Sequence, residues 1–311
     1  MLTVFGSINL DVCVRTKRMP KPGETVLGSD ALVSPGGKGA NQAHAAALFG
    51  AATRLYGMVG NDGFAVPALS KLIAHGVDTS GVGVAKAQST GVALVTVNDA
   101  GDNTIVVAPG ANLFARAEQV PAAVLRDSCV VLLQLEVPQD ECMELARRAG
   151  RAGCKVVLNA SPIPAGFSLK TGEVDVLIVN RVELDQLCNQ LQAFGIDPLD
   201  KARLAARSLG LEVLVTLGAE GSVLARPDGK SFAARASNLS VVDTTGAGDT
   251  YAGVFAASIA MGSSTAEAME VASAAAGLAC TRQGAQVAQP SRGAIDAELA
   301  RRKLRTGQGV A

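Results

Sequence analysis

Short apolar runs alternate with longer segments of helical pattern along most of the chain. Apolar runs typical of buried strands occupy residues 2–8, 54–59, 130–135, 156–159, 176–180 and 213–217. Helical patterns occupy residues 40–49, 67–75, 139–151 and 183–192, and lie within 250–261 and 266–281. Strands that alternate with helices favour a parallel sheet with helices on both faces. The predicted fold class is therefore α/β, with a mostly parallel central sheet.

Two segments lack a helical pattern. Residues 11–35 contain short β-type runs, and residues 82–108 alternate apolar and polar positions around a turn at 98–101. Both fit a small antiparallel sheet that stands off the main one. No repeat or linker separates independent domains, so residues 1–311 are predicted to form one domain. The basic segment 301–311 is predicted to be a disordered tail.

Composition narrows the class of protein. The chain has 28 Lys and Arg against 28 Asp and Glu, and this balance argues against a nucleic-acid partner. Its apolar runs are too short to span a bilayer, and no secretory signal pattern opens the chain. Six cysteines without C-x-x-C spacing are expected to be buried free thiols. A cytoplasmic protein without a membrane partner is expected.

The most informative motif is Asp243-Thr244-Thr245-Gly246-Ala247-Gly248-Asp249, which precedes an apolar helix. Glycines at a helix start let a ligand approach the free N–H groups, which favour an anion. A carboxylate there could take a proton from an attacking hydroxyl while the N–H groups stabilise phosphate charge. The alternative is that Asp249 only caps the helix.

A second glycine loop, Pro35-Gly36-Gly37-Lys38-Gly39-Ala40-Asn41, also precedes a helix. It matches neither the Walker A nor the Rossmann spacing. Its glycines, Lys38 and Asn41 could form a polar cradle for a hydroxylated ligand. A tight turn with a solvated lysine explains the same residues about as well.

Polar residues also follow several predicted strands, where open α/β sheets bind ligands. Asn9 and Asp11 follow the first strand and could hold sugar hydroxyls or form an Asx turn. Asn180 and Glu183 fit a capping box, or oxygens near a hydrated magnesium ion. Glu136 could be a ligand carboxylate or a solvated residue.

The two histidines, His44 and His75, lie in predicted helices. Neither has a metal-ligand partner at i+4, so both are expected to be structural or surface residues.

Together these motifs resemble the ribokinase, or PfkB, family of carbohydrate kinases. The resemblance runs from Gly6 to about Gln286 through G-S-I-N-x-D, G-G-K-G-A-N-Q-A, S-T-G-V-A-L, P-G-A-N, Q-L-E, N-x-x-E, T-L-G-x-x-G and D-T-T-G-A-G-D. It implies a three-layer α/β sandwich with a small β-sheet lid formed by residues 11–35 and 82–108. It also implies ATP-dependent phosphorylation of the 5-hydroxyl of D-ribose, with magnesium and potassium as cofactors.

The resemblance also implies site residues. The catalytic set would be Asp249 as general base, with Gly246, Ala247 and Gly248 as the anion hole. Ribose would be bound by Asn9, Asp11, Gly37, Lys38, Gly39, Asn41, Glu136 and Asp249. The nucleotide would contact Asn180, Thr216, Gly218, Glu220, Gly221, Gly248 and Ser273. Magnesium would be held through water by Glu183, and potassium by Asp243, Thr245, Ala279, Arg282 and Gly284, largely through backbone carbonyls.

Several alternatives stay open. The sugar could be deoxyribose or fructose, or the acceptor could be a nucleoside, although the chain has 2 Tyr, 8 Phe and no Trp for stacking. A non-catalytic sugar or nucleotide sensor of the same fold is a further alternative. The family resemblance implies a homodimer paired through the lid, which would cover an exposed sheet edge.

Overall fold

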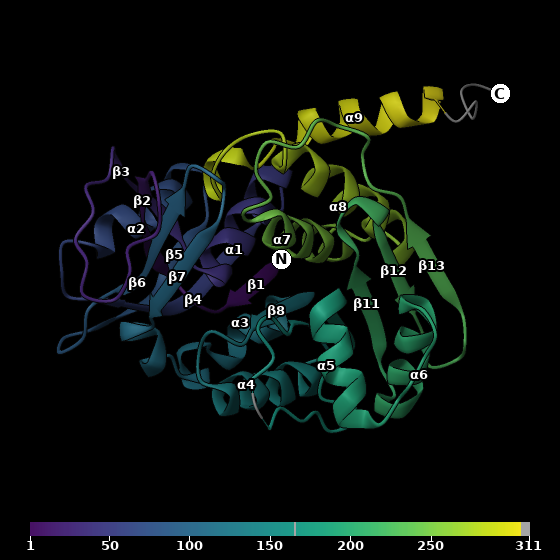
Figure 1. The fold of residues 1–311 in the computed structure, drawn as a ribbon. Coiled ribbons are helices and arrows are strands. Elements are labelled where there is room, and N and C mark those ends of the chain that lie inside the picture. Colours follow the sequence, from purple (N-terminus) through teal and green to yellow (C-terminus); the bar gives the residue numbers. More distant parts are fainter. Residues whose placement is uncertain (165, 306–311) are drawn as a thin grey trace.

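A nine-stranded sheet forms the centre of the computed structural model, which describes residues 1–164 and 166–305 (Figure 1). The strands lie in the order β13 (Ser231–Ala234), β12 (Ser222–Ala225), β11 (Glu212–Thr216), β10 (Val176–Asn180), β9 (Lys155–Asn159), β8 (Val130–Gln134), β1 (Leu2–Phe5), β4 (Thr53–Gly60) and β5 (Asp78–Ala85). All neighbours pair in parallel except at one edge, where β12 is antiparallel to both β11 and β13. The predicted α/β class with a mostly parallel sheet is confirmed.

Helices cover both faces of this sheet, and each face has its own apolar core. One core is formed with α1 (Lys38–Phe49), α2 (Ala65–Ala74), α7 (Ala247–Ala260), α8 (Thr265–Ala279) and α9 (Arg292–Arg305). The other is formed with α3 (Ala122–Asp127), α4 (Gln139–Arg151), α5 (Arg181–Leu191) and α6 (Pro198–Leu209). Figure 1 shows α4, α5 and α6 opposite α7, α8 and α9. Short 3-10 helices are η1 (Gly110–Phe114), η2 (Ala117–Gln119), η3 (Gly218–Glu220) and η4 (Gln286–Ala288).

A separate four-stranded sheet stands beside one end of the main sheet (Figure 1). Its order is β3 (Ala31–Gly36), β2 (Asn9–Thr16), β6 (Gly91–Asn98) and β7 (Asn103–Ala108). The two outer pairs are antiparallel, but β2 and β6 are parallel. The expected antiparallel sheet is thus a mixed sheet, because distant segments, not one hairpin, meet at its centre. Residues 82–85 belong to β5 of the main sheet and not to this one.

The chain ends differently from the prediction. Residues 301–305 continue α9, where the guanidinium groups of Arg301 and Arg302 bond to Glu298 one turn earlier. The rest of the predicted tail, 306–311, lies outside the described residues. Cys129 is exposed rather than buried, whereas Cys142, Cys154 and Cys188 are buried. None of the helices in the described part of the chain is long and apolar enough to cross a bilayer.

Candidate active site

Asp249 is a buried carboxylate in the first turn of α7. The side-chain amide of Asn41 donates to Asp249 Oδ2 at 2.9 Å, and that of Gln42 donates to Oδ1 at 3.0 Å. Both amides come from α1, which packs beside α7 in the same core. The carboxylate is therefore fixed by tertiary contacts between two helices, and it is more than a cap of its own helix.

The amides that hold Asp249 are themselves oriented by further amides. Gln134 donates to Gln42 Oε1 at 2.6 Å, so the Nε2 group of Gln42 must face the carboxylate. Gln286 donates to Asn41 Oδ1 at 3.1 Å and fixes that amide in the same way. All four amide residues are buried, where an unpaired polar group is costly. The network favours one orientation of Asp249, with acceptor lone pairs left for a substrate hydroxyl.

The start of α7 provides the N–H groups expected at an anion hole. Gly246 has a φ of 72°, a left-handed conformation that suits glycine, and a Cβ there would approach Ala285 to 3.0 Å. The Ala247 N–H donates to Thr244 O at a long 3.2 Å. Within the described residues, the N–H of Gly248 has no such acceptor. This N–H and the helix dipole favour an anion next to Asp249.

The second glycine loop packs against the end of β1 so closely that side chains are excluded. A Cβ on Gly39 would lie 2.6 Å from Gly6 C, and one on Gly37 would lie 2.7 Å from Asn9 N. The Asn112 amide donates to Asn9 Oδ1 at 2.7 Å and so orients that side chain. Glycine is needed here for close backbone approach, which brings the predicted cradle residues together beside Asp249.

Three carboxylates surround the cradle. Burial, together with the charges of Glu136 and Asp249, raises the pKa of Asp11 to about 6. Asp11 Oδ1 is buried without a hydrogen-bond partner in the described structure. Glu136 accepts from Ser7 Oγ at 2.6 Å and from Lys38 N at 3.2 Å.

Lys38 supplies the opposing charge. Asp249 raises the pKa of Lys38, burial opposes this, and Glu136 and Glu183 raise the pKa further. A protonated amine that several carboxylates act on, together with the unpartnered Asp11 Oδ1, suits a neutral ligand with several hydroxyl groups. The predicted cradle therefore has the chemistry of a sugar site.

A cleft of about 550 Å³ adjoins the start of α7. Five residues predicted to contact a nucleotide line it: Thr216, Gly218, Gly221, Gly248 and Ser273. Ser273 Oγ donates to Arg235 O at 2.6 Å, so this hydroxyl proton is already used. The cleft is also lined by small and apolar side chains, including Ala276 and Leu239.

The other two predicted nucleotide residues lie outside this lining. Asn180 Oδ1 accepts from Glu183 N at 2.9 Å, and Glu183 Oε2 accepts from Asn180 N at 2.8 Å. The capping box is thus present at the start of α5. Glu220 is exposed and pairs with Arg181 at 2.6 Å. Among the described residues no group of three His, Cys, Asp or Glu side chains could hold a metal ion.

The two loops predicted to hold potassium are joined. Asp243 Oδ2 accepts from Gly284 N at 2.8 Å, and Oδ1 accepts from Thr245 N and Oγ1. Burial acts to raise the pKa of Asp243, but these hydrogen bonds outweigh it and lower the pKa. A plain salt bridge from Asp243 to Arg282 would also join these loops, but it is absent from the described contacts. The carboxylate instead fixes the backbone of both loops.

No local pattern indicates that the residues supporting Asp249 meet. Gln42, Gln134, Asn159 and Gln286 surround Asn41 and Asp249, yet they come from four separate parts of the chain. Gln42 and Gln134 lie inside the motifs G-G-K-G-A-N-Q-A and Q-L-E, whereas Asn159 and Gln286 lie in none of the motifs. The latter two are single polar residues at the end of an apolar run and in a loop, and only the fold places all four together.

Comparison with known families supports the same interpretation. Residues 1–292 match the pfkB family carbohydrate kinases. The chain belongs to this family. A ribokinase from Haemophilus influenzae is 34% identical over 300 residues, which cover 94% of this chain and 95% of the relative. A deoxyribokinase from Salmonella typhi is 32% identical over 297 residues, which cover 93% and 95%.

A solved structure has the same fold. The Arabidopsis thaliana ribokinase complexed with ribose and ATP superposes with a TM-score of 0.84 at 31% identity, covering 96% of this chain and 98% of that one. This carbohydrate kinase is therefore similar to ribokinases along nearly its full length, while a deoxyribokinase is similar to almost the same degree.

Proposed function

We propose that this carbohydrate kinase transfers the γ-phosphoryl group of ATP to O5 of D-ribose, giving D-ribose 5-phosphate and ADP. The observation that carries the proposal is the buried Asp249 carboxylate, which two oriented amides hold at a glycine-rich helix start. Asp249 takes the proton of the 5-hydroxyl as that oxygen attacks phosphorus in line with the leaving ADP oxygen. The N–H groups of residues 246–248 stabilise the charge on the transferred group.

The remaining cradle residues hold the sugar. Asp11, with its unpartnered buried oxygen, accepts from ring hydroxyls, and Asn9 is held by Asn112 to bond another. Gly37, Lys38, Gly39, Asn41 and Glu136 complete the proposed ribose set. The Arabidopsis relative, whose structure holds ribose and ATP, supports this choice of sugar and donor. Binding through several fixed groups positions O5 for attack, and this positioning supplies much of the rate enhancement.

ATP fits the cleft of about 550 Å³ beside α7, and the lid sheet stands over the sugar side and limits water. The Glu183 carboxylate is buried, and its charge acts on Lys38. Its proposed role is to order the water shell of magnesium. The joined loops of Asp243 and Gly284 offer backbone oxygens for potassium. When bound, these cations would neutralise phosphate charge and stiffen the anion hole.

The test is an assay of a sugar panel with ATP and magnesium, using Asp249→Asn and the control Asp140→Asn. Asp140 lies in the first turn of α4 but is exposed, so its substitution makes the same chemical change away from the site. We expect ribose to be the best acceptor. Asp249→Asn should lower kcat about 100-fold or more, whereas Asp140→Asn should leave it unchanged. Near-normal kcat in Asp249→Asn would return Asp249 to a capping role.

A deoxyribokinase activity is the second candidate, because the Salmonella relative is nearly as similar as the ribokinases. The same panel separates the two activities through kcat/KM for ribose and 2-deoxyribose. A higher value for 2-deoxyribose would replace the ribose assignment, without changing the role of Asp249.

We also propose that two copies pair through the lid sheet. Large apolar side chains are exposed on it: Leu32, Val33, Leu94, Ile105, Val106 and Val107. The pairing register puts Val33, Leu94 and Val106 on one face of this sheet, and an exposed apolar face of this kind suits burial against a second copy. Light scattering should give the mass of a dimer, and Val106→Lys should give a monomer; a monomeric wild type would contradict the pairing.

A further inference from the structure

One wall of the nucleotide cleft is a segment without regular secondary structure, residues 235–241, between β13 and α7. Five of its residues line the cleft: Ala236, Ser237, Asn238, Leu239 and Val241. Backbone hydrogen bonds anchor it at Leu239 N, which donates to Ser237 O at 3.0 Å, and just beyond it at Val242 N, which donates to Cys280 O at 2.8 Å. Side chains of α8 and α9 supply further anchors, and Figure 1 shows the segment as the green loop that passes beside α9.

The carbonyl oxygen of Arg235, at the start of the segment, accepts two hydrogen bonds. Ser273 Oγ of α8 donates to it at 2.6 Å, and Arg302 Nη1 of α9 donates to it at 3.2 Å. Arg302 Nη1 also lies 3.6 Å from Glu270 Oε2 of α8. The Arg302 guanidinium therefore joins the segment to α8, whose residues Ser273 and Gly277 also line the cleft.

Ser237 is the second point at which α9 holds this wall. Its hydroxyl donates to Glu298 Oε1 at 2.8 Å and accepts from Arg302 Nη2. A Cβ on Gly277 would lie 2.7 Å from Ser237 Cβ, so the serine packs directly on α8. Its single hydroxyl proton is already used by Glu298. The contacts of Ser237 with α9 therefore act on the position of the wall, not on the nucleotide directly.

Glu298 is the centre of the contacts that α9 makes. Its side chain is 4% exposed, and its carboxylate accepts from Arg301, Arg302 and Ser237. The hydrogen bonds from Arg301, and then those from Ser237 and Arg302, lower the pKa of Glu298 to about 2, although burial opposes this shift. The carboxylate is therefore charged at neutral pH. A buried charge is costly without its donors, so these donors stay in place around it.

We propose that Glu298 and Arg302 are positioning residues for the nucleotide, because they hold residues 235–241 in the arrangement that forms the cleft wall. The inference rests on the proposed function, since it takes the cleft of about 550 Å³ as the ATP site. A wall that is already ordered costs less to bind against than one that must be ordered by its ligand. The contacts from α9 therefore increase the affinity for ATP without touching it.

This role predicts which kinetic constants change. Asp249 is held by Asn41 and Gln42 of α1, and the sugar cradle is formed by residues of β2, β3 and α1. Glu298 and Arg302 instead contact residues 235–241 and α8. Loss of their contacts should raise the KM for ATP, while kcat at saturating ATP and the KM for the sugar stay near the wild-type values.

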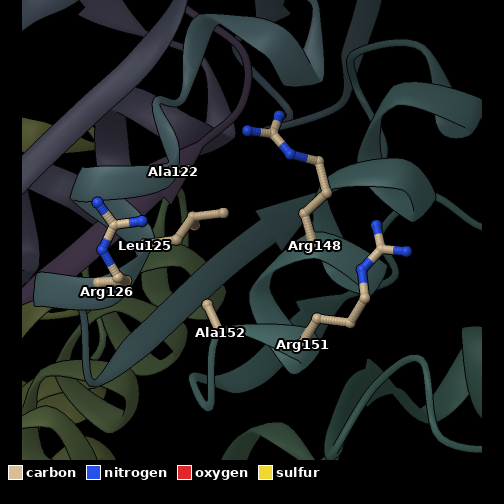
Figure 2. A pocket seen from close by; sticks show the side chains of 6 residues that line it. All are labelled: Ala122, Leu125, Arg126, Arg148, Arg151 and Ala152. Carbon is tan, nitrogen blue, oxygen red and sulfur yellow. The ribbon is translucent and has the colours of Figure 1, made fainter.

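A matched control lies on the other face of the main sheet. Figure 2 shows Arg148 of α4 in a hollow that it lines with Arg126. Like Arg302, Arg148 is half-buried, and its guanidinium donates to loop carbonyls, those of Ala117 and Val120. Arg148→Gln therefore removes the same kind of support from a loop outside the lining of the nucleotide cleft.

The experiment compares Arg302→Gln, Glu298→Gln and Arg148→Gln with the wild type. Steady-state kinetics give kcat and the KM for ATP, calorimetry gives the Kd of ADP, and urea unfolding gives the stability of each variant. Arg302→Gln and Glu298→Gln should each raise the KM for ATP and the Kd of ADP about fivefold or more, with kcat unchanged. Arg148→Gln should lose stability while it binds ADP as the wild type does.

The two α9 variants change the net charge in opposite directions, since one removes a cation and the other removes an anion. A simple effect of charge on the anionic nucleotide would therefore shift the two Kd values in opposite directions. Ser237→Ala leaves the ion pairs of α9 intact and removes only its link to the wall, so it should also raise the Kd of ADP.

Opposite shifts in Arg302→Gln and Glu298→Gln would overturn the positioning role. A Kd of ADP that stays at the wild-type value in Arg302→Gln and Ser237→Ala would also overturn it. An equal rise of the Kd in Arg148→Gln would overturn it as well, because any loss of stability would then weaken binding. A wild type that binds no ADP would instead contradict the proposed function of the cleft.

Discussion

Replacing Asp11 with asparagine should stabilise the protein at neutral pH while weakening sugar binding. Burial, then the charges of Glu136 and Asp249, raises the pKa of Asp11 to about 6 from its ordinary 3.8. The folded chain therefore holds this proton more tightly than the unfolded chain. The resulting stabilisation is complete below pH 3.8 and is lost as the pH rises to 6.

The size of the effect follows from the shift. About two pKa units, at 1.36 kcal/mol each, correspond to about 3 kcal/mol of folding free energy that the ionised Asp11 costs above pH 6. Asparagine has nearly the same shape and no charge to bury. No described residue donates a hydrogen bond to Asp11 Oδ1, so the substitution breaks no such bond there.

Urea unfolding from pH 4 to pH 8 measures this difference. Asp11→Asn should equal the wild type near pH 4 and exceed it by about 3 kcal/mol at pH 8. Asp99→Asn, at an exposed turn of the lid, should follow the wild type throughout. The KM for ribose should rise about tenfold or more in Asp11→Asn, because a charged acceptor is lost. If the free energies of unfolding of Asp11→Asn and the wild type changed with pH in the same way, the inference that ionised Asp11 destabilises the fold would be refuted.

Three further predictions concern the loops and the sugar. Gly39→Ala should destabilise the fold by about 1–3 kcal/mol in urea unfolding, because the new Cβ would lie 2.6 Å from backbone atoms. The control is Gly63→Ala, whose Cβ would meet nothing within 4 Å. Equal stability of the two variants would refute the close packing at Gly39. The kcat in potassium should exceed the kcat in sodium or in a bulky organic cation at equal ionic strength, with little change in KM. Identical kcat values in the three salts would rule out a cation site at Asp243. The kcat/KM for 2-deoxyribose should be about 5- to 150-fold lower than that for ribose, because a polar group left unpaired at Asn9 or its neighbours costs about 1–3 kcal/mol. Equal values for the two sugars would show that the cradle does not bind the missing hydroxyl.

Local pattern was sufficient for much of the fold. The buried strands and their helices follow from apolar runs and periodicity, and the glycine motifs mark both helix starts at the site. Patterns were weaker at α6 and at the antiparallel pair β12 and β13, where no helix or strand is predicted from the sequence. In the lid, the parallel pairing of β2 with β6 joins residues about 80 positions apart, and no local pattern indicates such a partner.

The sequence by itself determined the kinds of group at the site: a carboxylate after a glycine pair, a glycine cradle, and polar residues after strands. These depend on neighbours in the chain, because helix starts and tight turns are local structures. Tertiary structure alone decided which groups meet. Asn41 and Gln42 lie over 200 residues from Asp249, yet both bond it, and Gln134 and Gln286 fix their orientation. Burial, which raises the pKa of Asp11, is likewise a property of the packed molecule, since it depends on atoms from every surrounding segment.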